Sequence, residues 1–74
     1  MATLNGAEAF ERETREIIRR FRSNEIGLPE CVAALDAVLA NIVPDLAPEQ
    51  LPRIQAVLLA NNRAVMEEME DRAG

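Results

Sequence analysis

Few side chains in this 74-residue chain could carry out covalent or acid–base chemistry. The sequence has no histidine, lysine, tyrosine or tryptophan, and Ser23, its single serine, lies in a polar break with no base nearby. Cys31 falls on an apolar helical face, where we expect a small buried side chain rather than a nucleophile. No glycine-rich phosphate loop and no zinc-ligand spacing occurs in the sequence. We therefore expect no enzyme activity, no cofactor, no metal and no small-molecule substrate.

Two adjacent asparagines, Asn61 and Asn62, stand out in the apolar stretch VLLANNRAVM, residues 57–66. An amide moves no proton, so a structural or binding role is favoured over catalysis. An unpaired buried amide costs roughly 1–3 kcal/mol, so buried asparagines are expected to be hydrogen-bonded. Helical periodicity places two further polar side chains near the same height of the fold. We predict one polar layer there, formed by Thr14, Asp36, Asn61 and Asn62.

Two alternatives to this polar layer stay open. The two asparagines would also fit a polar spot within a groove that binds a partner. The Thr14 hydroxyl, in turn, would be satisfied by the carbonyl of Phe10 in its own helix.

The elements that would position these side chains are three helices, predicted at about residues 6–23, 29–43 and 51–70. Asn5 and Glu8 form a capping-box pattern at the first helix, and Asn24 or Gly27 suits the left-handed geometry that ends it. Pro29 suits the start of the second helix, and Pro44 stops it. Pro48 and Pro52 cannot share one helix start, so a short turn is expected at residues 48–51. Residues 1–4 and 71–74 are expected to fray.

Each helix carries an apolar face that predicts its core side. The second helix offers Cys31, Val32, Leu35, Val38, Leu39, Ile42 and Val43. The third offers Leu51, Ile54, Leu58, Val65 and Met69, widened by Val57, Leu59 and Met66. Because short connections make sequential helices antiparallel neighbours, we predict an all-α fold: one up-down-up three-helix bundle over residues 1–74. The first and third helices then run parallel, with their C-terminal ends together.

The net charge of −5 limits the kinds of partner that the chain is expected to bind. Nucleic acids and anionic membranes attract a basic surface, so we expect the chain to bind neither of them. No signal segment opens the chain, and no uncharged apolar run approaches the roughly 20 residues of a membrane span. A single cysteine forms no internal disulfide, which favours a reducing cytoplasm. All eight cations are arginine, which we attribute to a bacterial genome rich in G and C rather than to a preference for forked hydrogen-bond donors.

Charge is distributed unevenly along the chain. The first 24 residues carry four acids and five arginines, whereas the rest carries nine acids and three arginines, a net of +1 against −6. A basic cluster lies at the C-terminal end of the first helix, and an acidic cluster lies at the C-terminal end of the third. Together we call them the charged pole: Arg19, Arg20, Arg22, Glu67, Glu68 and Glu70. We expect these side chains to pair with each other across the surface. A docking point for a basic partner or a hard cation is the alternative.

The outer side of the second helix is unusually poor in the charges that an exposed helix normally carries. It carries three alanines, and its only polar residues are Glu30 and Asn41; we call Ala33, Ala37, Ala40 and Asn41 the alanine face. Alanine is the best helix former, so propensity alone would account for them. Small residues at this spacing also let another helix approach closely, so we predict an association surface here, most simply in a symmetric homodimer.

Two functions are compatible with these patterns. The first is a small cytoplasmic interaction or adaptor protein that binds another protein, or itself, through an apolar or alanine-rich helix face. The second is an acidic inhibitor or antitoxin-like protein that occupies a basic site on a partner enzyme. Salt distinguishes them, because electrostatic capture weakens steeply with ionic strength and apolar docking does not.

Overall fold

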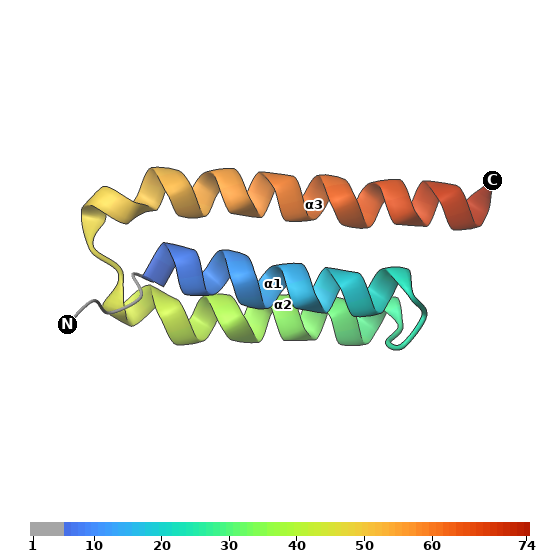
Figure 1. Ribbon diagram of the computed structural model, residues 1–74, viewed down its shortest axis with the longest axis horizontal. Coiled ribbons are helices and arrows are strands. Elements are labelled where there is room, and N and C mark those ends of the chain that lie inside the picture. The colour runs from blue at the N-terminus through green and yellow to red at the C-terminus, as the bar shows by residue number, and fades with distance from the viewer. Residues whose placement is uncertain (1–5) are drawn as a thin grey trace.

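The first and last helices lie side by side and point the same way, with the middle helix antiparallel to both (Figure 1). The computed structural model describes residues 6–74. Its helices are α1 (Gly6–Arg22), α2 (Leu28–Ile42) and α3 (Leu51–Ala73), and two short 3₁₀ turns, Val43–Asp45 and Pro48–Gln50, join the last two. No strand occurs within residues 6–74. The predicted all-α, up-down-up three-helix fold is confirmed.

The helix boundaries follow from local backbone chemistry. Asn24 has a left-handed φ of 65°, which ends α1 as predicted. The N–H of Gly27 donates to the Glu30 carboxylate at 2.9 Å, and a Cβ on Gly27 would meet that carboxylate at 2.6 Å. Pro44 ends α2 in a 3₁₀ turn. Pro52 occupies the first turn of α3, where a missing N–H breaks no helical hydrogen bond. The predicted cap at Asn5 lies outside the described residues.

α1 is the shared packing partner of the other two helices. Its buried residues are Ala7, Phe10, Thr14, Ile18 and Phe21, whereas α2 buries Cys31 alone and α3 buries only Ile54 and Val57. α1 packs along both α2 and α3, and these two make little contact with each other. The two phenylalanines, each 1% exposed or less, supply the largest buried side chains. The core is therefore a line of α1 side chains covered from two sides.

The C-terminal end of α3 projects beyond the loop that joins α1 and α2 (Figure 1). α3 continues to Ala73, three residues beyond the end predicted at residue 70. Arg72 explains the difference: its guanidinium lies 4.3 Å from the centre of the Phe21 ring and donates to the Phe21 carbonyl at 2.6 Å. The same guanidinium pairs with Glu68 at 3.0 Å. These contacts hold the last turns of α3 against the end of α1.

We expect Arg72→Ala to lower the free energy of unfolding by about 1 kcal/mol, because a cation–π contact and a hydrogen bond are lost. Urea denaturation followed by circular dichroism would measure this change, together with a loss of helicity from the end of α3. Arg63→Ala is the control, since Arg63 is exposed on the same helix and forms no ion pair with another described residue. Equal stability of the two variants would contradict the prediction.

Candidate functional site

An open apolar groove runs between α2 and α3, with Phe10 of α1 among its lining residues. It exists because both helices pack on α1 rather than on each other. The side chains from α2 are Val32, Leu35, Asp36 and Leu39, and those from α3 are Leu58, Asn61, Asn62, Val65 and Met66. We call this feature the apolar groove. Most of its lining is apolar, and no helix within residues 6–74 covers it.

The apolar groove consists mainly of side chains that the sequence assigned to the core. Met66 is 60% exposed and Val32 is 45% exposed, while Leu35, Leu39 and Leu58 are half-buried. Leu59, next to the groove, is 71% exposed. The predicted core faces of α2 and α3 are therefore only partly correct. Periodicity identified the apolar arcs, but α1 alone is too narrow to cover both of them.

The predicted polar layer does not form as a hydrogen-bonded unit among residues 6–74. Thr14 is fully buried, but its hydroxyl donates to the Phe10 carbonyl at 2.8 Å, within its own helix. Asn61 is half-buried, whereas Asn62 and Asp36 are exposed, and all three line the apolar groove. The reason is the separation of α2 from α3, which leaves the amides beside an open surface. This placement fits the alternative of a polar spot within a binding groove.

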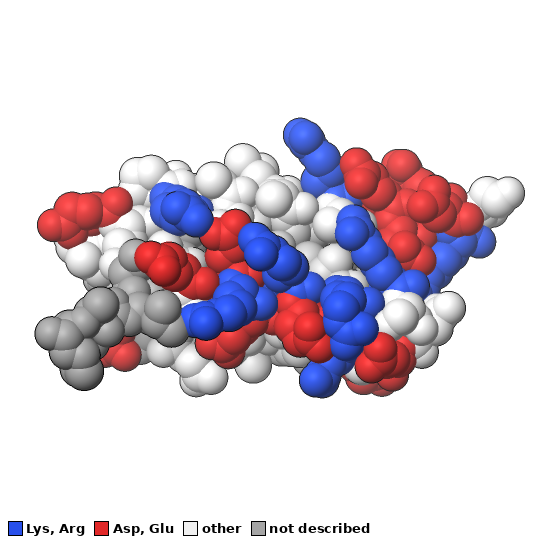
Figure 2. All heavy atoms as spheres, in the orientation of Figure 1, with Lys and Arg blue, Asp and Glu red and all other residues white. Residues whose placement is uncertain are grey.

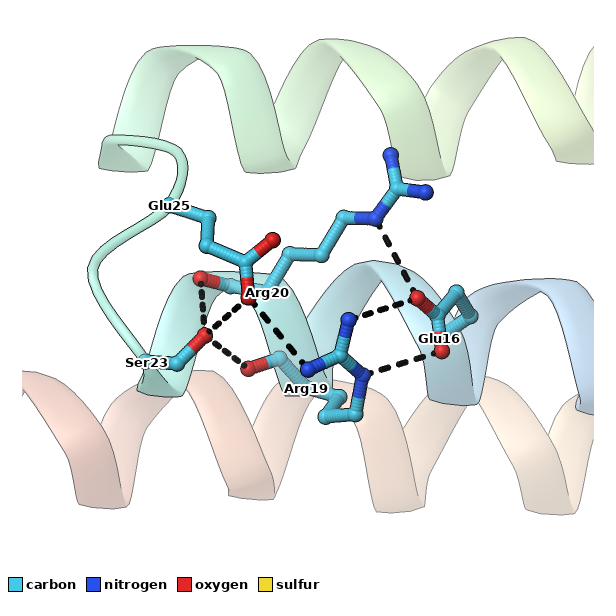
Figure 3. A network of polar contacts seen from close by, with 5 residues as sticks. All are labelled: Glu16, Arg19, Arg20, Ser23 and Glu25. Carbon is cyan, nitrogen blue, oxygen red and sulfur yellow. Dashed lines mark hydrogen bonds and ion pairs between the residues drawn. The ribbon is translucent and has the colours of Figure 1, made fainter.

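The charged pole also differs from its prediction. Arg19 and Arg20 both pair with Glu16 of their own helix, at 2.8 and 3.2 Å, and Arg19 also reaches Glu25 at 3.3 Å (Figure 3). No ion pair joins Arg19, Arg20 or Arg22 to Glu67, Glu68 or Glu70 within residues 6–74; Glu68 pairs with Arg72 instead. Arg19, Arg20 and Glu68 pair with residues about one turn away on their own helix, because the helix itself fixes that geometry.

This network shifts the titration of two carboxylates. The pKa of Glu16 is lowered to about 2, and the largest cause is the hydrogen bond that Arg19 donates to its carboxylate. Desolvation of Glu16 has a smaller effect in the opposite direction. The pKa of Glu25 is lowered chiefly by the hydrogen bond that the Ser23 hydroxyl donates at 2.8 Å. Ser23 is thus occupied by the cluster and by the Arg19 and Arg20 carbonyls, which agrees with a structural role.

The low pKa of Glu16 makes the stability of the fold depend on pH in the acidic range. Because this pKa is lower in the folded state than its ordinary value of 4.5, the stabilisation is present above about pH 4.5 and is lost as the pH falls towards 2. We expect Glu16→Gln to lose less thermal stability than the wild type between these values, as measured by melting followed by circular dichroism. Glu13→Gln is the control, because Glu13 is exposed on α1 and forms no salt bridge with another described residue. Identical acid profiles for all three proteins would refute the assignment.

The remaining candidate positions are inert or simply exposed. Cys31 is a free, buried thiol whose pKa is raised by desolvation, which opposes its use as a nucleophile. Among residues 6–74, no three acidic, cysteine or histidine side chains are grouped so that they could hold a metal ion. No helix in the same range is long and apolar enough to cross a bilayer. The alanine face, Ala33, Ala37, Ala40 and Asn41, is exposed on α2.

Comparisons of the chain with protein-family models, with curated proteins and with solved structures returned no match. The groove and the exposed faces are therefore the basis of the functional proposal.

Proposed function

We propose that this protein is a small interaction module that binds an amphipathic helix of a partner protein in the apolar groove. The observation that supports it is the separation of α2 and α3, which leaves their apolar arcs without a neighbour. The three helices are arranged like three members of a four-helix bundle, and the position of the missing fourth helix lies between α2 and α3, opposite α1. A helix placed there would cover Val32, Leu58 and Met66 together.

The polar groups in the apolar groove favour a defined register for that helix. Asn61 and Asn62 lie within the apolar lining, where docking would bury their amides and require hydrogen-bonding partners. A polar residue inside an otherwise apolar seam fixes alignment at some expense of affinity. Across the groove, Asp36 offers an acceptor on α2. The bound helix is therefore expected to carry a polar residue midway along its apolar face.

Charges at the outer edge of the apolar groove favour basic flanks on the bound helix. Asp36 lies on the α2 side, and Glu67 and Glu70 lie beyond Met66 on α3, with Arg63 as the one cation in the adjoining hollow. Exposed pairs of this kind contribute little affinity but select the partner and its orientation. We further propose that the protein is cytoplasmic and has no catalytic activity. The free thiol of Cys31 supports the first of these, because free thiols are typical of a reducing compartment.

A synthetic helix of about 20 residues, with a leucine face and arginine flanks, would serve as the probe. We expect Val32→Glu/Met66→Glu to weaken its binding about tenfold or more in fluorescence anisotropy, because docking would bury two uncompensated charges. Both side chains are exposed, so folding should persist. The control Gln55→Glu/Ala56→Glu adds the same charge at exposed positions outside the groove and outside the alanine face. Equal weakening by both pairs would contradict groove binding, and a steep loss with salt would instead favour the acidic-inhibitor function.

Association through the alanine face stays a separate prediction. Its support is that Ala33, Ala37 and Ala40 are all exposed at helical spacing on α2, where Glu30 is the charged residue on the same side. We expect static light scattering to give twice the monomer mass for the wild type and the monomer mass for Ala37→Glu, which would place a charge at the centre of the contact. A monomeric wild type throughout the micromolar range would end this prediction.

A further inference from the structure

A second hollow lies between α1 and α3, on a face of the molecule that does not include α2. Its floor is formed by Ile18 and Val57, together with two alanines of α3, Ala60 and Ala64. α3 is tied to α1 towards its two ends, by Arg53 paired with Glu11 and by Arg72 on Phe21. Between these ties the alanine side chains are too short to fill the space beside α1. The hollow is therefore a consequence of which residues α3 presents to α1.

One wall of this hollow is a row of arginines, and we call the whole feature the arginine groove. Spacings of three and four residues place the four guanidinium groups on one stripe of α1: Arg12, Arg15, Arg19 and Arg22. Figure 2 shows basic side chains gathered over the part of the molecule where α1 lies, with acidic side chains among them. The arginine groove holds four cations and two acids, Glu11 and Glu16, a net of +2 within a chain of net −5.

The arginines of this row differ in how far they are already satisfied. Arg15 pairs with Glu11 at 3.0 Å, and Arg19 pairs with Glu16 at 2.8 Å. Arg12 and Arg22, at the two ends of the row, form no ion pair with another described residue. Ten residues of helix separate them, a rise of about 15 Å or nearly three turns. The row thus offers two available cations, one near each end of an apolar floor.

We propose that the arginine groove is a second interaction surface, which receives an acidic amphipathic helix of a partner protein. The small side chains of Ala60 and Ala64 allow a helix to approach closely, and Ile18 and Val57 supply apolar contact. Acidic residues about three turns apart on that helix would pair with Arg12 and Arg22. Forked guanidinium groups suit carboxylates because they can donate two parallel hydrogen bonds. This proposal does not depend on the use of the apolar groove.

A helix is favoured over an anionic membrane surface for two reasons. The arginine groove is concave along the helix axes, whereas a bilayer would touch only the tips of the arginines. Glu11 and Glu16 also lie in the groove, where they would face the lipid phosphates across a broad contact and repel them. A single helix can instead set its carboxylates opposite Arg12 and Arg22 and leave these two acids beside Arg15 and Arg19.

The test compares two synthetic helices of about 20 residues that share a leucine–alanine face and differ in their flanks, glutamate in one and glutamine in the other. Fluorescence anisotropy at low salt should show the glutamate helix binding the wild type at least fivefold more tightly, with the difference shrinking as salt is added. Arg12→Gln/Arg22→Gln should abolish this preference. Arg63→Glu, which changes the net charge by the same two units on an exposed arginine outside the groove, should retain it.

Ala60→Leu provides a variant that keeps every charge, and it should weaken both peptides by filling the floor of the arginine groove. Val32→Glu/Met66→Glu, in the other groove, should leave the preference unchanged. The proposal is overturned if the wild type shows no preference for the glutamate helix, or if Arg63→Glu removes that preference as fully as the double glutamine variant does. It is equally overturned if vesicles of phosphatidylcholine and phosphatidylserine bind through Arg12 and Arg22 while the glutamate helix does not.

Discussion

The packing of both outer helices against α1, rather than against each other, is the constraint on which the rest of the structure depends. The two phenylalanines of α1 supply most of the buried volume, and each outer helix buries at most two side chains fully. A core arranged along one helix leaves apolar surface on the other two. In a domain this small, such surface is a large fraction of what could stabilise the fold. The open groove and the modest core are therefore two results of one arrangement.

Much of the fold could be predicted from the sequence because its boundaries depend on local chemistry. Asn24, Pro44 and Pro52 each permit few backbone conformations, and the structure places a helix end or start beside each of them. The apolar periodicity then identified the apolar arc of each helix, although only part of the arcs of α2 and α3 is buried. The end of α3 was missed because Arg72 is fastened by the ring and the carbonyl of Phe21, a contact between residues 51 positions apart.

The candidate site could be predicted less well, for a reason that lies in the same periodicity. A helical wheel shows that Leu58, Asn62 and Met66 share a broad side of α3, but it does not show whether a neighbouring helix reaches that side. The sequence signal for an open surface was the width of the apolar arc of α3. This arc runs from Val57 round to Leu59, which is too wide for α1 and α2 together to cover. The hydrogen bond from the Thr14 hydroxyl to the Phe10 carbonyl, by contrast, joins residues four positions apart in one helix. Such a local bond could be predicted from the sequence, as one of two alternatives for Thr14.

Every cation of the arginine groove is a guanidinium group. Guanidinium groups keep their protons far above physiological pH, and the chain contains no lysine or histidine that could gain or lose charge in their place. Lysine acetylation, a common way to erase positive charge, has no target anywhere in the sequence. The positive surface of α1 is thus a permanent one, and control over any association through it would fall to the ionic medium, to arginine methylation or to the acids of the binding partner.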